Sequence, residues 1–265
     1  MMGEVTFIGA GPGSADLITV RGLKRLQAAQ VVLFDALTDP ALREQAPQAL
    51  WVDVGKRGFC DSTGQTRINA LLVNYAKSHQ RVVRLKGGDA SVFGRLEEEL
   101  QALKAAGIAS EVVPGVTAAI AAAAALQRPL TRRGRGRSVA LTTAVATEPD
   151  GSPVLRSSRS ADTEVFYMAS RQLGALARRL IQAGWPEHTP VCVVSRAGCP
   201  DQLSSDHALG ELASASVLHA GRPSVVTVGV GAEPVAIAAA KAPETHRLGL
   251  ESEHNSTASD RRVLS

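Results

Sequence analysis

The chain has 265 residues, 45% apolar and 20% charged, so we expect a folded protein of one large or two small domains, and global disorder is excluded. The net charge of +4 comes mainly from arginine, which grips carboxylates and phosphates in a bidentate manner and also serves on ordinary solvated surfaces. Apolar runs fall far short of the ~20 residues of a membrane span, and the first residues lack a secretory signal, which predicts a cytoplasmic protein with no membrane partner.

The first half of the chain alternates between predicted strands and helices. Five short apolar runs are typical of buried strands: 5–9, 31–35, 51–54, 81–85 and 111–113. Five segments show helical spacing or helix-end signals: 20–29, 40–46, a stretch around 68–75, 97–106 and 117–126, the last with Thr117 as its cap. This alternation predicts βαβ units and a mostly parallel sheet.

A segment rich in glycine and arginine, 131–137, interrupts this pattern and is predicted to be a linker. It would separate an N-terminal α/β domain, 1–130, from a C-terminal α/β domain, 138–242. Further strands are predicted beyond it at 138–142, 164–168, 191–195 and 224–230. Composition predicts a surface excursion at 148–161 and a disordered tail at 243–265.

Three glycine turns follow predicted strands. They are GAGPG at 9–13, the GGD of RLKGGD at 87–89, and PGVTAA at 114–119. Because parallel strands end at the same edge of a sheet, the turns favour one cleft lined by backbone and suited to a small polar cofactor. Ordinary strand-to-helix turns are the alternative.

A dinucleotide site is disfavoured by two residues of the first turn. The third glycine of that fingerprint is replaced by Ser14, and Pro12 lacks the N–H that a phosphate cradle would use. Asp35, at the end of the second predicted strand, would bind a ribose in such a site. It could equally be a catalytic carboxylate or a helix cap.

Cysteine and histidine predict neither a disulfide framework nor a metal site. The three cysteines, Cys60, Cys192 and Cys199, form no CxxC pair, and their number is odd. The six histidines are scattered, and none pairs with a cysteine at the spacing of zinc ligands.

Eight ordered blocks resemble the uroporphyrinogen-III C-methyltransferases, which belong to the tetrapyrrole methylases. The blocks are GAGPG, VVLFDALTD, VGKR, QTRINALL, RVVRLKGGD, VFGR, VVPGVTAA and PLTRRG, and the likeness covers about residues 3–240. It implies two α/β domains with S-adenosylmethionine in the cleft between them, in a homodimer. It also implies two successive C-methylations of uroporphyrinogen III, giving precorrin-2 for sirohaem or cobalamin.

The resemblance also assigns residues. Asp35 matches a proposed proton acceptor, and Lys56 of VGKR matches a proton donor. The positions that match cofactor contacts are Pro12, Gly87, Gly88, Asp89, Val92, Thr117, Ala118, Met168 and Ala197.

Uroporphyrinogen carries eight carboxylates, so its site requires concentrated positive charge. Four arginines lie within 131–137, and we predict that Arg132 and Arg133 bind the substrate. A grip on RNA phosphates and a solvated linker are the alternatives.

Some blocks depart from the family. The chain reads GGDASVFGRLEEE where GGDPFxFGRGGEE is common, GFCDSTGQ after VGKR, and Arg132 where histidine is usual. These changes leave open a later precorrin methylase of the same superfamily or a relative that only binds its ligands. The ribosomal-RNA branch typically opens with a GTPIGN-like loop, whereas this chain has GAGPGS, so we predict no nucleic-acid partner.

Overall fold

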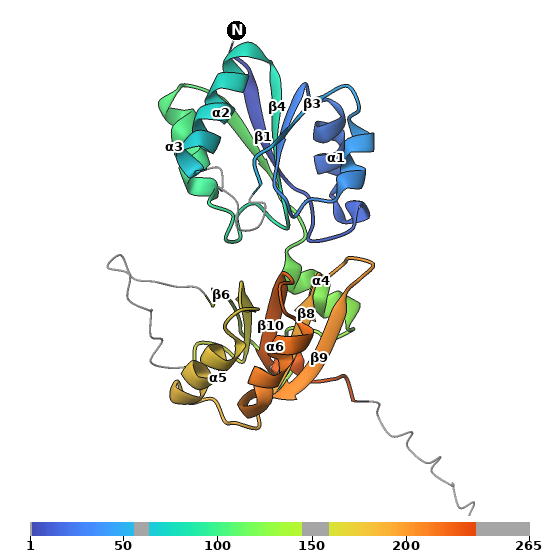
Figure 1. The fold of residues 1–265 in the computed structure, drawn as a ribbon, viewed down its shortest axis with the longest axis vertical. Coiled ribbons are helices and arrows are strands. Elements are labelled where there is room, and N and C mark those ends of the chain that lie inside the picture. The colour runs from blue at the N-terminus through green and yellow to red at the C-terminus, as the bar shows by residue number, and fades with distance from the viewer. Residues whose placement is uncertain (1, 56–63, 145–158, 237–265) are drawn as a thin grey trace, which may run out of the picture. The chain divides into compact units, whose positions relative to one another are not determined.

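Two five-stranded sheets make up the described part of the chain, residues 2–55, 64–144 and 159–236 of the computed structural model (Figure 1). The described helices and strands all lie within one compact unit, Met1–Pro234. Lys56, Cys60 and the predicted tail 243–265 lie outside the described residues, as does most of the predicted excursion 148–161. None of the described helices is long and apolar enough to cross a bilayer.

The first sheet is parallel throughout, with the order β3-β2-β4-β1-β5. Its strands are β1 Glu4–Gly9, β2 Val31–Phe34, β3 Leu50–Asp53, β4 Arg81–Lys86 and β5 Ala109–Val113. The three central strands are buried along almost their whole length, as expected where helices cover both faces. The strands predicted in the first half, and their parallel arrangement, are therefore confirmed.

Helices cover both faces of this sheet (Figure 1). They are η1 Ala15–Leu17, α1 Val20–Gln27, η2 Pro40–Gln45, α2 Gln65–Ser78 and α3 Leu96–Ala105, of which η1 and η2 are 3-10 helices. Successive strand residues point to opposite faces, so Phe7 packs with Leu72 of α2 and Leu103 of α3. Its neighbour Ile8 packs with Leu26 of α1 on the other face.

The second sheet is mixed, with the order β6-β7-β10-β8-β9. Its strands are β6 Val139–Thr143, β7 Thr163–Tyr167, β8 Pro190–Ser195, β9 Leu203–Ala208 and β10 Ser224–Gly229. Only β6 and β7 pair in parallel, while β10 runs antiparallel to β7 and β8, and β9 antiparallel to β8. One face is covered by α5 Leu173–Gln182, η3 Leu209–Ser214 and α6 Ala215–Leu218. The four strands predicted here are confirmed, whereas β9 and these helices are not anticipated by the sequence pattern.

The alanine-rich helix α4, Ala118–Ala125, follows β5 of the first sheet but packs on the second. Ala119 and Ala122 are buried in one cluster with Val194 of β8 and Val225 of β10. Methyl side chains let the helix backbone lie close to the strands. The sequence predicts the helix but not the sheet that it covers.

Candidate functional site

The three glycine turns meet at the carboxyl edge of the first sheet. Gly11 and Gly88 exchange backbone hydrogen bonds, with Gly88 N donating to Gly11 O at 2.7 Å and Gly11 N to Gly88 O at 3.2 Å. The turn after β5 lies equally close, because a Cβ on Gly9 would stand 2.6 Å from the Cα of Gly115. Any side chain here would force the turns apart, so glycine is what permits their approach.

Gly88 differs from these packed glycines because space is open beside its Cα. A Cβ there would meet a single atom within 4 Å, the carbonyl oxygen of Val116 at 4.0 Å. Its φ of +72° is also one that side-chain-bearing residues seldom adopt. The turn therefore forms a backbone-lined cradle that a side chain would fill.

Asp89 holds this cradle together. Its carboxylate accepts hydrogen bonds from Gly115 N at 2.8 Å, from Ser91 N at 2.8 Å and from the Ser91 hydroxyl. Partial burial alone would raise the pKa of Asp89, but these bonds outweigh it and the pKa lies below its usual value. The side chain is thus an anion that ties the turn after β4 to the turn after β5.

Thr117 occupies the cap position of α4, but its side chain does not cap the helix. Its hydroxyl instead bonds to the Tyr167 hydroxyl at 2.6 Å, at the end of β7. Tyr167 Oη also accepts from Ala119 N at 3.3 Å, and its ring lies 5.0 Å from the ring of Phe93. The predicted cap position is therefore confirmed, but the hydroxyl bonds to the tyrosine and not to the helix, and this contact joins the PGVTAA turn to the second sheet.

Two more turns of the second sheet carry predicted cofactor positions. Met168, directly after β7, has 51% of its surface exposed and a left-handed φ of +56°, a strained conformation that often marks functional sites. Ala197, after β8, is buried, and its neighbour Gly198 accepts a hydrogen bond from Ser14 N at 3.0 Å. A Cβ on Gly13 would lie 2.5 Å from the Gly198 carbonyl carbon. The GAGPG turn therefore packs directly on the turn after β8.

Asp35 lies at the end of β2, on the rim of a pocket of about 300 Å³ that Thr38, Arg43 and Trp51 also line. Its side chain is 29% exposed, and Oδ1 accepts a hydrogen bond from Arg84 Nη2 at 2.6 Å. The following helix η2 is capped by Asp39, whose Oδ1 accepts from Ala41 N. Of the three roles open from sequence, the helix cap is therefore wrong.

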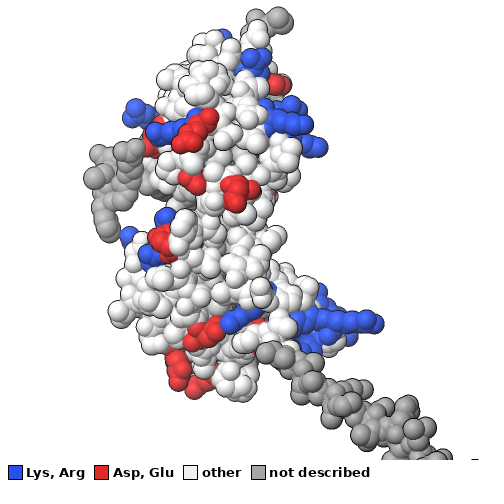
Figure 2. Space-filling model, turned by 90° about the vertical axis from the view of Figure 1, so that its right-hand side faces the viewer, with Lys and Arg blue, Asp and Glu red and all other residues white. Residues whose placement is uncertain are grey.

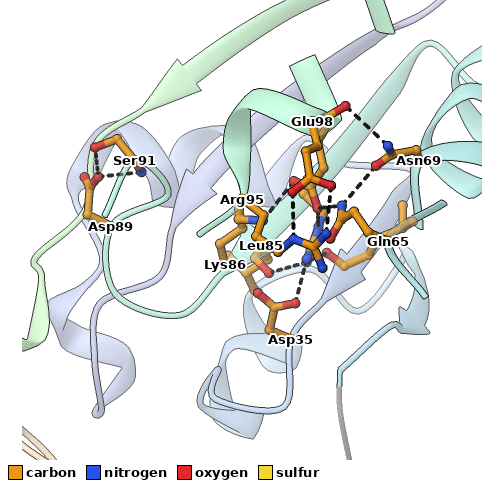
Figure 3. A network of polar contacts seen from close by, with 12 residues as sticks. Asp35, Gln65, Asn69, Leu85, Lys86, Asp89, Ser91, Arg95 and Glu98 are labelled. Atoms are coloured by element: carbon orange, nitrogen blue, oxygen red, sulfur yellow. Dashed lines mark hydrogen bonds and ion pairs between the residues drawn. The ribbon is translucent and has the colours of Figure 1, made fainter. Parts of the chain in front are cut away.

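Asp35 is supported by a buried ionic network that the sequence pattern does not predict (Figure 3). Arg84 and Lys86 of β4 are 2% and 3% exposed, and Glu99 of α3 is fully buried. Arg84 Nε donates to Glu99 Oε1 at 3.1 Å, and Lys86 Nζ donates to Glu99 Oε2 at 2.8 Å. Burial, and then the charge of Arg84, lower the pKa of Lys86, whereas Glu99 opposes the shift. Two basic residues, Arg84 and Lys86, beside the apolar residues of the strand RVVRLK are the signal that could have pointed to this network.

The predicted linker forms a tight turn. Arg132 and Gly136 pair through their backbones, and the Arg132 guanidinium donates to the carbonyl oxygens of Glu233 and Pro234. Arg135 forms an ion pair with Glu233 at 2.9 Å, and Arg133 is exposed. On the face shown in Figure 2, basic side chains form separate patches with carboxylates between them.

Several predicted positions meet at one place, and others do not. Gly87, Gly88 and Asp89 lie with the Thr117–Ala118 turn, while Pro12 belongs to the turn that packs on Ala197 and Gly198. Pro12, Val92 and Ala118 are partly exposed. Lys56 lies outside the described residues, and Arg132 and Arg133 belong to the separate 131–137 turn.

Two further observations concern metals and thiols. No group of three histidine, cysteine or acidic side chains within the described ranges could hold a metal ion. Cys192 and Cys199 are free thiols, and burial, with the charge of Asp206, raises the pKa of Cys192 to about 12. Cys192 is therefore a core thiol and not a nucleophile.

Comparison with known proteins gives consistent results. The family described as Tetrapyrrole (Corrin/Porphyrin) Methylases matches residues 4–213. A uroporphyrinogen-III C-methyltransferase from Pseudomonas aeruginosa is 39% identical over 90% of this chain and 100% of its own length. A siroheme synthase from Actinobacillus pleuropneumoniae is 41% identical over 86% of this chain, which spans about half (47%) of that longer protein.

Solved structures agree in fold. The uroporphyrin-III C-methyltransferase of Thermus thermophilus, complexed with S-adenosyl homocysteine, superposes with a TM-score of 0.74 at 35% identity, over 86% of this chain and 97% of that one. A cobalt precorrin-4 methyltransferase superposes with a TM-score of 0.76 at 30% identity, over 87% and 96%. The mixed α/β architecture with two sheets is therefore shared with these enzymes.

Proposed function

The chain belongs to the tetrapyrrole methylases, and on this premise we propose that it methylates uroporphyrinogen III at two ring carbons in succession. S-adenosylmethionine is the methyl donor, and the product is precorrin-2, a precursor of sirohaem and cobalamin. The observation that carries the proposal is the meeting of three glycine turns around the open cradle at Gly88, in a chain 39% identical to such an enzyme.

The residues around the cradle suit this cofactor. Gly88 leaves room beside the backbone, Asp89 is ionised and can accept further hydrogen bonds, and Met168 offers an exposed apolar side chain. When bound, the cofactor supplies a methyl group already activated on a positively charged sulfur. We assign its contacts to Pro12, Gly87, Gly88, Asp89, Val92, Thr117, Ala118, Met168 and Ala197.

The protein's chemical task is to align the substrate carbon and to handle protons. Each methylation leaves the substrate with one proton to lose. We assign the acceptance of that proton to the Asp35 carboxylate, and the support is its partial exposure in a pocket and its ion pair with Arg84. Lys56 of VGKR, in the part of the chain that is not described, is assigned as the proton donor.

Arg132 and Arg133 are assigned to the substrate's carboxylates. The support is the concentration of guanidinium groups in the 131–137 turn and the exposure of Arg133. In this proposal the turn separates a segment 1–130 from a segment 138–242, although α4 of the first segment packs on the second sheet. We further propose that the enzyme acts in the cytoplasm as a homodimer, which sedimentation of the purified protein would test.

A later precorrin methylase is the second candidate. The superposition on a cobalt precorrin-4 methyltransferase and the unusual GGDASVFGRL loop favour it. To test this, the protein is incubated separately with uroporphyrinogen III and with a later precorrin, each with isotopically labelled S-adenosylmethionine. The products are then identified by mass spectrometry. We expect uroporphyrinogen III to gain two methyl groups. No gain there, with a gain on the later precorrin, would replace the first proposal with the second.

A further inference from the structure

Both buried cations of β4 contact Glu99. Arg84 and Lys86 are two residues apart on the strand, so they project to the same side of the sheet. Each donates to a different oxygen of Glu99, a residue of α3. Gln65 of α2 adds a third donor, with Nε2 at 3.3 Å from Glu99 Oε1.

Arg84 carries this interaction onward to Asp35. Its Nε is bonded to Glu99, its Nη1 to the carbonyl oxygens of Leu33 and Leu85, and its Nη2 to Asp35. Every guanidinium nitrogen thus has a partner, and the planar group cannot turn without losing several bonds. The orientation of Arg84 therefore fixes where the Asp35 carboxylate lies.

Charge balance links the same four groups. Glu99 forms ion pairs with both Arg84 and Lys86, and Asp35 forms a further ion pair with Arg84. Stability alone does not explain these buried ions, because a protein with well-packed apolar residues in their place is often as stable or more stable. A positioning role explains why β4 buries Arg84 and Lys86.

We propose that Glu99 is a positioning residue, which acts through Arg84 to hold the Asp35 carboxylate in its productive orientation. The proposal rests on the role proposed above for Asp35. Glu99 is fully buried and so does not touch the substrate. Its effect must appear in turnover, because misplacing a reacting group by about 1 Å can cost about 100-fold.

The first test is Glu99→Gln, which keeps the shape of the side chain but removes its charge. We expect kcat to fall by about 10- to 100-fold, while the KM for uroporphyrinogen III and the Kd for S-adenosylhomocysteine stay unchanged. The matched control is Glu97→Gln on the same helix, where the exposed carboxylate contacts Gln101 and turnover should be retained. An unchanged kcat for Glu99→Gln would overturn the proposal.

A double-mutant cycle with Asp35→Asn separates positioning from general damage. If Glu99 acts through Asp35, adding Glu99→Gln to Asp35→Asn costs little further turnover in single-turnover assays. The proposal would be overturned if the two substitutions together reduced turnover by the product of their separate effects, or if the Kd for S-adenosylhomocysteine rose. Either result would mean that Glu99 only supports the fold or the adjoining Gly87 turn. Wild-type turnover in Asp35→Asn would instead refute the role of Asp35 itself, even if Glu99→Gln were impaired.

Arg84→Lys keeps the test decisive if Glu99→Gln fails to fold. Lysine retains the positive charge but lacks the planar fork that reaches both carboxylates. We expect the same fall in kcat with cofactor affinity retained. Full turnover in a folded Arg84→Lys variant would overturn the proposal independently.

Discussion

At the scale of single residues, Gly88 combines a left-handed backbone with open space beside its Cα. Asp35 combines partial exposure with a strong bond to a buried arginine. The first property suits binding of a ligand against the backbone, and the second suits a fixed proton acceptor. Substitutions at the two positions should therefore have different kinetic effects.

Replacing Gly88 with valine should weaken cofactor binding. The side chain would fill the cradle, and we expect the Kd for S-adenosylhomocysteine to rise at least about 10-fold by calorimetric titration, a loss of about 1.4 kcal/mol. Gly221→Val is the matched control, because Gly221 also has a positive φ (+68°) with no atom within 4 Å of a Cβ. Equal affinities in the two folded variants would remove the turn after β4 from the cofactor site.

Replacing Asp35 with asparagine should remove turnover and spare binding. Asparagine has nearly the same shape but cannot take a proton at neutral pH, so we expect kcat to fall at least about 100-fold. Asp39→Asn changes another carboxylate of the same pocket: asparagine keeps the capping bond from Ala41 N but loses the bond that Oδ2 accepts from Ala15 N, so stability should fall somewhat while turnover of the folded variant survives. Retained turnover in Asp35→Asn would show that another group accepts the proton.

At the scale of elements, His219 links the end of α6 to the second sheet. It is fully buried, with Nδ1 paired to the Ser195 hydroxyl of β8 and Nε2 to the Ser205 hydroxyl of β9 at 2.9 Å. Burial, followed by the nearby charges of His207 and Arg222, lowers the pKa of His219. The folded protein therefore disfavours the protonated form of this imidazole.

This predicts a loss of stability in acid. Below the unfolded-state pKa of about 6.5, His219 is protonated in the unfolded chain. In the folded chain it takes up this proton only at a lower pH, because its pKa is lowered. The free energy of unfolding should fall across that window by at most about 1.4 kcal/mol per pH unit. Urea unfolding at several pH values measures this pH dependence of the free energy of unfolding. We expect His219→Asn to reduce the dependence, whereas the control His188→Asn, at an exposed histidine, should leave it unchanged. If the free energy of unfolding of His219→Asn depended equally steeply on pH, other groups would be responsible for the loss of stability in acid.

The elements also show what the sequence can and cannot predict. Strands such as β2 were predictable because short, wholly buried apolar runs end in turn residues. β9 was missed because its residues LSSDHA are polar and largely exposed, as suits an edge strand. The pairing of Arg84 with Glu99 was missed because it depends on how α3 packs against β4, which local spacing does not encode.

At the scale of the whole molecule, the site depends on contacts between segments far apart in sequence. The glycine turns were predicted as one edge because parallel topology alone brings strand ends together. The bond from Thr117 to Tyr167, 50 residues away, and the packing of α4 on the second sheet required the full fold. The grouping of the strand-end glycine turns is therefore predictable from topology, whereas the link between the PGVTAA turn and the second sheet depends on tertiary packing.

The arginines of the 131–137 turn give a prediction at this scale. Replacing both Arg132 and Arg133 with glutamine should raise the KM for uroporphyrinogen III by about 10-fold while cofactor affinity stays constant. Added salt should weaken substrate binding to the parent protein, since exposed ion pairs are screened over about 8 Å at physiological ionic strength. Arg25→Gln, which breaks an exposed ion pair with Glu111 elsewhere, is the control. An unaltered KM in the double variant would show that these arginines have only a structural role in the turn.

The most direct test of the central claim is a crystal structure of the protein with S-adenosylhomocysteine. The claim is that turns of both sheets together form the cofactor site. We predict that the ligand lies against the backbone of Gly88 and within contact of Asp89, Thr117 and Met168. A well-ordered ligand bound elsewhere, with the space beside Gly88 still open, would contradict it.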